Sequence, residues 1–157
     1  MIRYVSVALL PFAMLASADE DTPRSDVEAI TKTALDYGQG WYEGDAEQME
    51  RALHPDLAKR VLMPDPRTGK GKIEHMSALR LVQFTRRGGG TRTPKDKRKT
   101  TVTILDVVGH AVSVKLEMHD WIDYMHMSKV DGRWVIVNVL WELTPEAKMR
   151  KGDADKS

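Results

Sequence analysis

The feature that most constrains the fold is a change of apolar spacing at Thr100, after which hydrophobic residues recur at every second position. A period of two is typical of a β-strand with one buried face, whereas helical spacing dominates before this point. Two short breaks, Gly109-His110 and Asp131-Gly132, fit the two-residue turns that close hairpins. The sequence therefore predicts a four-stranded antiparallel meander over residues 101–141.

Three helices are predicted before the meander. The first covers residues 25–41 and the second covers residues 45–53, each with a capping residue at its start and apolar side chains on one face. A short extra strand is expected near Val61, and apolar residues about three apart predict a third helix over residues 73–82. The order helix, helix, strand, helix and four strands is typical of an α+β fold, in which about three N-terminal helices pack on a curved antiparallel sheet.

The N-terminal stretch has the pattern of a signal peptide. Arg3 precedes an apolar run over residues 4–15, and Ala16-Ser17-Ala18 supplies the small residues that signal peptidase recognises. The run is shorter than the roughly 20 residues that span a bilayer. We expect cleavage near Ala18 and a secreted or periplasmic protein without a stable membrane anchor. The expected organisation is a signal peptide at 1–18, a linker at 19–24, one domain at 25–143 and a polar tail at 144–157.

Composition excludes several classes of function. The chain has no cysteine, which rules out disulfides and thiol chemistry. His119 and His126 would face opposite sides of a strand and stand roughly 23 Å apart, so we expect no metal site. No phosphate-binding or dinucleotide glycine motif is present, and no cofactor is predicted.

Charge gives no indication of a nucleic-acid partner. Once Arg3 is removed from the 24 basic residues, 23 remain and balance the 23 acidic ones. Residues 86–99 form a basic segment, but it lacks the aromatic side chains on which bases stack. We interpret it as a solvated connection, with an anionic partner such as lipopolysaccharide as the alternative.

The hairpin closed by Asp131-Gly132 indicates a sheet that is covered on both sides. If Val130 pairs with Arg133, alternation sorts the hairpin into two faces, and both are largely apolar. Helices can cover one face, and we expect a second copy of the chain to cover the other, giving a homodimer through the sheet. One face would carry Trp121, Asp123, Met125 and Asn138, and the other Tyr124, His126, Val139 and Trp141.

Asp123 and Asn138 would lie diagonally opposite, about 7–8 Å apart at the backbone. A carboxylate and an amide among apolar residues are typical of a small-molecule cavity. The alternative is that Asp123 has only a structural role, as a hydrogen-bond acceptor for a helix terminus or a tryptophan. The residues alone leave both interpretations open.

Several motifs resemble one known family. The segment from Tyr37 to Asp45 (YxxGWYxGD), Leu53-His54-Pro55, Trp121-x-Asp123-Tyr124 and Asp131-Gly132-x-Trp134 are similar to the putative lumazine-binding branch of the nuclear-transport-factor-2-like superfamily. The resemblance covers about residues 25–143. It implies a cone-shaped fold with a pocket between the curved sheet and the helices, and frequent dimers through the sheet.

The resemblance favours a binding domain for a small, partly apolar molecule. Trp41, Met76, Trp121 and Met125 would form the walls, Asp123 and Asn138 would orient the ligand, and His54 and His75 are candidates for the rim. Two alternatives remain at this stage. One is an isomerase or lyase that uses Asp123 or a nearby histidine in acid–base chemistry. The other is a dimeric scaffold without a ligand.

Overall fold

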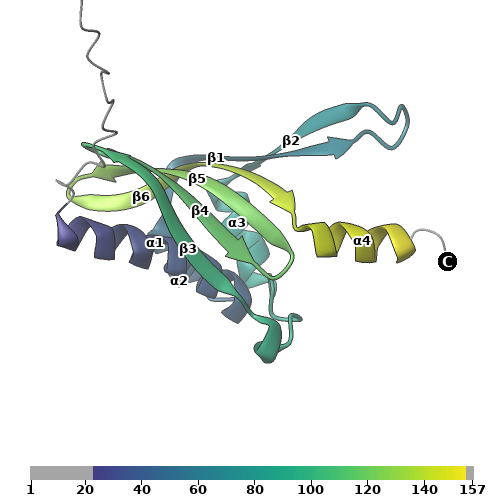
Figure 1. Ribbon diagram of the computed structural model, residues 1–157, viewed down its shortest axis with the longest axis horizontal. Helices are drawn as coiled ribbons and strands as arrows, with labels where there is room; N and C mark the ends of the chain where they lie inside the picture. Colours follow the sequence, from purple (N-terminus) through teal and green to yellow (C-terminus); the bar gives the residue numbers. More distant parts are fainter. Residues whose placement is uncertain (1–22, 155–157) are drawn as a thin grey trace, which may run out of the picture.

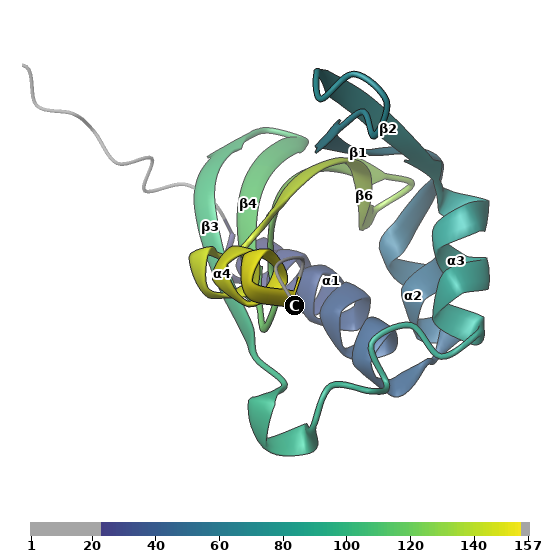
Figure 2. The same ribbon diagram turned by 90° about the vertical axis from the view of Figure 1, so that its right-hand side faces the viewer.

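The computed structural model describes residues 23–154 and shows an α+β domain in which helices pack on one side of a curved sheet (Figure 1). The sheet has six strands in the order β2-β1-β6-β5-β4-β3. Figure 2 shows that α1, α2 and α3 lie on the side toward which the sheet curves. The elements are α1 (Arg24–Glu43), α2 (Ala46–Ala52), β1 (Leu53–Pro64), β2 (Gly71–Ser77), α3 (Ala78–Arg86), the short 3-10 helix η1 (Lys95–Lys97), β3 (Thr100–Val108), β4 (Ala111–Met118), β5 (Trp121–Val130), β6 (Arg133–Leu143) and α4 (Pro145–Ala154).

The predicted fold class is confirmed, although the sheet is mixed because β1 runs parallel to β6. The expected tight turn is present as well: Asp131 and Gly132 both have positive φ, at 48° and 76°. Two positive φ angles are the conformation of a type I′ hairpin turn. Helix α4 lies within the segment that the sequence indicated as a polar tail.

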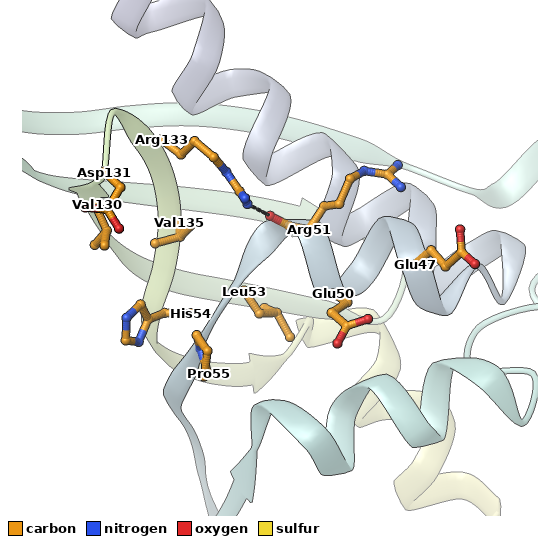
Figure 3. Close-up of a pocket in the computed structure, with 10 residues that line it drawn as sticks. All are labelled: Glu47, Glu50, Arg51, Leu53, His54, Pro55, Val130, Asp131, Arg133 and Val135. Atoms are coloured by element: carbon orange, nitrogen blue, oxygen red, sulfur yellow. Dashed lines mark hydrogen bonds between the residues drawn. The ribbon is translucent and has the colours of Figure 1, made fainter.

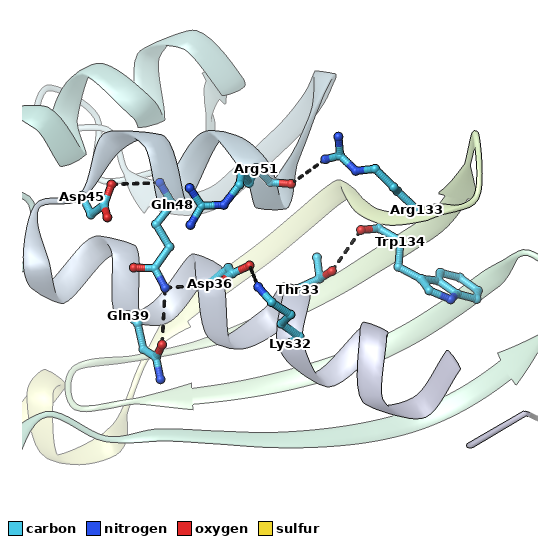
Figure 4. A network of polar contacts seen from close by, with 9 residues as sticks. All are labelled: Lys32, Thr33, Asp36, Gln39, Asp45, Gln48, Arg51, Arg133 and Trp134. Carbon is cyan, nitrogen blue, oxygen red and sulfur yellow. Dashed lines mark hydrogen bonds and ion pairs between the residues drawn. The ribbon is translucent and has the colours of Figure 1, made fainter. Parts of the chain in front are cut away.

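A network of polar contacts joins α1 to α2 (Figure 4). Asp45 caps α2 by accepting a hydrogen bond from the Gln48 amide at 2.9 Å, as its position predicted. The Gln48 side chain donates to Asp36 of α1 at 3.1 Å. Thr33 of α1 donates to the main-chain oxygen of Trp134 at 3.0 Å, which ties the helix to β6. These contacts fix the helix pair against the sheet.

The region between α2 and α3 differs from the sequence prediction. The strand expected near Val61 extends over the whole of β1, and Ile73 and Met76 belong to β2 rather than to a helix. Pairing of β1 with β2 decides this, since Leu62 lies opposite Ile73 and Lys59 lies opposite Met76. Helix α3 begins only after Ser77, whose hydroxyl accepts from the Arg80 amide.

A β-bulge at Val137 changes the register of the second hairpin. Met127 pairs with Ile136, but His126 pairs with Asn138, so Val137 is an extra residue on β6. Because side chains alternate, every β6 residue after the bulge lies on the opposite face from the one predicted. Val139 and Trp141 turn toward the helices, whereas Asn138 and Leu140 turn away.

The core lies between the helices and the concave face of the sheet. Ile30, Met49, Val114, Leu116, Ile136 and Val139 are fully buried there. On the outer face of the hairpin Tyr124 and Leu140 are 48% and 51% exposed, so one chain covers only the inner face, and cover of the outer face by a second copy stays a prediction. Among residues 23–154, no helix is long and apolar enough to cross a membrane.

Candidate functional site

An apolar cavity of about 180 Å³ lies between the helices and the sheet. The elements that meet around it are α1, α3 and the strands β1, β2, β5 and β6. This volume is below the roughly 300–1,000 Å³ of pockets for drug-sized ligands, so the cavity suits a small molecule. Its lining residues are Tyr37, Trp41, Lys59, Met76, Leu81, Trp121 and Trp141.

Three tryptophans form a continuous aromatic wall. The ring centroids of Trp41 and Trp121 are 6.1 Å apart with planes inclined at 72°. Trp121 and Trp141 have the same separation, at 68°. Such edge-to-face pairs are favoured by the charge distribution of aromatic rings and hold one another in place. The wall therefore presents preformed aromatic surface to a ligand.

One polar cluster lies at the wall of this cavity. The Lys59 ammonium donates to the hydroxyl of Tyr37 at 2.6 Å and to Oδ1 of Asp123 at 2.5 Å. The Tyr37 hydroxyl donates to the same Oδ1 at 3.2 Å. Asp123 is fully buried and Lys59 is only 8% exposed. Because Lys59 and Tyr37 line the cavity and Asp123 does not, the carboxylate stands behind them.

Burial dominates the electrostatics of the cluster. Desolvation lowers the pKa of the Lys59 ammonium, and the Asp123 carboxylate opposes this by stabilising the charged form. Desolvation also raises the pKa of the Tyr37 hydroxyl well above its usual value, and the neighbouring carboxylate adds to the effect. The Lys59 nitrogen lies 5.3 Å from the ring centroids of both Tyr37 and Trp141, within cation–π distance. Within residues 23–154, the only charged group that lines the cavity is thus an amine in a low-dielectric, aromatic setting.

The structure brings together part of the predicted site. Trp41, Met76 and Trp121 line the cavity. Met125, also expected at the wall, does not line the cavity and is buried in the core, at 1% exposure. Asp123 lies on the predicted face, but Lys59 and Tyr37 stand between it and the cavity.

Three predicted site residues lie elsewhere. Asn138 was expected beside Asp123, but the bulge at Val137 places it on the outer face, where it accepts from Arg60 at 2.7 Å. His75 is exposed on β2 opposite Arg60. His54 lies on β1 and lines a different groove.

The groove that His54 lines has a larger volume than the tryptophan-lined cavity, about 710 Å³ (Figure 3). Figure 3 shows acidic and basic side chains spread along it rather than converging, and Arg133 donates to the main-chain oxygen of Arg51 at 3.0 Å. A binding site needs apolar enclosure with a few convergent polar groups, and the tryptophan-lined cavity meets that description better. Within the described part of the chain, no group of three His, Asp or Glu residues is arranged to hold a metal ion.

The basic segment 86–99 contacts Trp41 of the cavity wall through its glycines. Gly90 donates its amide to the main-chain oxygen of Trp41 at 2.9 Å. A Cβ at Gly90 would lie 2.5 Å from Cδ1 of the Trp41 ring. Arg98 anchors the segment by an ion pair with Glu43 at 2.7 Å and by hydrogen bonds to the oxygens of Thr91 and Thr93. The segment therefore packs against Trp41 without lining the cavity itself.

Comparison with known proteins agrees with this architecture. An NTF2-like protein of unknown function from Shewanella baltica is 19% identical over 80% of this chain and 98% of that chain, with a TM-score of 0.61. A second, from Silicibacter pomeroyi, is 15% identical over 79% and 100%, with a TM-score of 0.59. A protein with a cystatin-like fold from Nostoc punctiforme is 13% identical over 82% and 98%, also with a TM-score of 0.59. At these identities the likeness shows the fold alone.

A search of curated proteins found no match. The family described as "Putative lumazine-binding" matches residues 25–142, which is most of the chain. The match extends from the first turn of α1 to the end of β6 and so includes every element around the cavity. The chain belongs to this putative lumazine-binding family, and its fold is similar to that of NTF2-like proteins.

Proposed function

We propose that the protein binds a small, flat, largely apolar molecule in the tryptophan-lined cavity. The observation that carries the proposal is the enclosure of about 180 Å³ by three tryptophans, a tyrosine and two aliphatic side chains, with one amine at the wall. Aromatic walls favour a planar ligand, and the Lys59 ammonium favours an acceptor group on that ligand. Two of its three donors already point to Tyr37 and Asp123, which leaves one for a ligand.

A screen of small aromatic compounds by melting-temperature shift tests this proposal. Met76 is half-buried at the cavity wall, so Met76→Trp should fill the cavity and abolish the shifts that the wild-type protein shows. Met63→Trp, in the same hairpin but outside the cavity, is the matched control and should keep them. Equal shifts for Met76→Trp and wild type would refute binding at this site.

The geometry gives less support to an isomerase or lyase with Asp123 as a direct base. Lys59 and Tyr37 occupy the side of the carboxylate that faces the cavity, and no histidine of the described part of the chain lines the cavity. A base must reach the proton that it removes, directly or through one water.

We also propose a homodimer through the outer face of the sheet. Tyr124 and Leu140 are paired neighbours there, and Leu62 and Ile73 continue the exposed apolar surface onto β1 and β2. Two copies related by a two-fold axis would cover this surface. Light scattering should give the mass of a dimer for the wild type and of a monomer for Leu140→Lys, whereas Met149→Lys on α4, at an exposed methionine, should remain dimeric. A monomeric wild type would contradict the proposal.

Export is proposed from residues 1–18, which lie outside the described part of the structure. An N-terminal positive charge, an apolar run and Ala16-Ser17-Ala18 support it. Intact mass of the secreted or periplasmic protein should begin at Asp19. Recovery with Met1 in place would overturn the prediction.

A further inference from the structure

Lys59 has an unusual position for a buried ion-paired lysine. Buried charge pairs carry a desolvation penalty, and apolar residues of similar size often serve stability equally well. This pair stands at a cavity wall, with the amine on the cavity side and the carboxylate behind it. Met76 and the three tryptophans at the wall are only half-buried.

The neighbours of the amine are suited to proton transfer. The Asp123 Oδ1 accepts from both the ammonium and the Tyr37 hydroxyl, so one carboxylate oxygen contacts both groups. Among residues 23–154, no group hydrogen-bonds the buried Oδ2 of Asp123. A proton can therefore move between Lys59 and Asp123 without a change in the net charge of the site. Desolvation, which lowers the pKa of Lys59, favours the neutral amine.

We propose that Lys59 captures small aromatic aldehydes and ketones covalently, as an imine on its ε-nitrogen. This inference rests on the proposed function, because the carbonyl compound must first enter the tryptophan-lined cavity. A lysine desolvated in an apolar pocket is the setting in which proteins activate an amine for attack on a carbonyl carbon.

Imine formation needs only proton transfers among Lys59, Tyr37 and Asp123, and it releases one water. The Lys59 ammonium passes a proton to Asp123, and the neutral amine attacks the carbonyl carbon to form the C–N bond. A proton then moves from nitrogen to the former carbonyl oxygen, with the Tyr37 hydroxyl as the relay, and a carbinolamine results. Asp123 returns its proton to the carbinolamine hydroxyl through the Tyr37 hydroxyl, which contacts Oδ1 of Asp123 and lines the cavity, and the C–O bond then breaks as water leaves. The positively charged iminium then faces the Asp123 carboxylate, as the ammonium did before.

The walls define the class of carbonyl compound. Trp41, Trp121 and Trp141 offer aromatic surface, and the small volume admits about one ring. Among the residues that the structure describes, no second cation lines the cavity, so a dianionic sugar phosphate is a poor fit. An uncharged aryl aldehyde has the right shape and presents its carbonyl to the amine.

Reductive trapping tests the inference. The full-length chain is incubated with benzaldehyde and cyanoborohydride at neutral pH, and peptide mapping follows the benzyl label on each lysine over time. Lys59 should acquire label several times faster than the exposed Lys70, since desolvation lowers the pKa of the Lys59 amine and so raises its neutral fraction. Met76→Trp should remove this advantage without changing the rate at Lys70.

Benzyl alcohol separates the two proposals, because it has the same ring but no carbonyl. Its binding is followed by ligand-observed NMR on the wild type and on Met76→Trp. If Lys59 is labelled no faster than Lys70, covalent capture is overturned. Binding of benzyl alcohol in that case would leave the cavity function standing, and its absence would count against that function as well. Faster labelling of Lys59 that survives Met76→Trp would also overturn the inference, because the aldehyde would not have used the cavity.

Discussion

Asp123→Asn should destabilise the protein strongly at neutral pH, because it removes the counter-charge of the buried Lys59. Breaking one partner of a buried ion pair costs about 3–5 kcal/mol. The loss in the free energy of unfolding also has an upper limit. The unpaired Lys59 can lose its proton, and each pH unit below the ordinary lysine pKa of 10.5 costs about 1.36 kcal/mol. This cost of deprotonating Lys59 limits the destabilisation to about 4.8 kcal/mol at pH 7 and to about 2 kcal/mol at pH 9.

The pH dependence has a definite sign. In the variant the folded-state pKa of Lys59 lies further below 10.5, so the unfolded chain binds more protons between the two pKa values. Stability of Asp123→Asn should therefore rise with pH relative to wild type. Urea unfolding followed by circular dichroism at pH 7 and pH 9 measures this directly.

Two further variants complete the test. Lys59→Met combined with Asp123→Asn leaves no unpaired charge and should recover most of the loss, giving a large coupling energy in the double-mutant cycle. Asp36→Asn breaks the more exposed pair with Lys32 and should cost less than about 1 kcal/mol. A cost for Asp123→Asn below about 1 kcal/mol that does not vary with pH would refute the buried ion pair.

Three other changes have defined outcomes. In Asp26→Asn, the free energy of unfolding should fall less steeply as the pH is lowered. The hydrogen bond from Lys129 lowers the pKa of Asp26, and the stabilisation from the Asp26 carboxylate is lost as pH falls through that pKa. Gly90→Ala should cost about 1–3 kcal/mol in urea unfolding, because its Cβ would meet the Trp41 ring. Tyr37→Phe should lessen the loss of stability above about pH 10 in alkaline titration, where unfolded tyrosine ionises before the buried hydroxyl does.

Local patterns were sufficient for the first two helices and for the meander. The period-two region and the Asp131-Gly132 turn are both present, since positive φ at both turn positions needs residues of this type. The region around Ile73 and Met76 was predicted as helix because a spacing of three fits a helix. Pairing with β1, which local spacing does not encode, makes it a strand.

The bulge had no sequence signal. Val137 is an ordinary strand residue among other apolar ones, yet it shifts the register and exchanges the faces of Asn138 and Trp141. A one-residue shift reverses every later side chain, so one missed bulge placed an outer-face amide in the predicted site and left a cavity tryptophan out of it.

Lys59 was missed for a different reason. It stands beside Arg60 in a strand, and a pair of adjacent basic residues is normally expected at a solvated position. Its burial depends on Asp123, which is 64 positions away in the chain. Asp123 itself was found because a carboxylate in the middle of an apolar strand requires a partner. That requirement was the available signal for a buried cation, although it did not say which one.

The most direct measurement is native mass spectrometry of the protein purified without denaturation from the cells that produce it, compared with Met76→Trp. A bound small molecule should add mass to the wild-type protein, disappear on denaturation if held noncovalently, and be absent from Met76→Trp. A wild-type protein that carries no added mass, and that gains none with any small aromatic compound in the screen, would contradict the assignment of the tryptophan-lined cavity as a binding site.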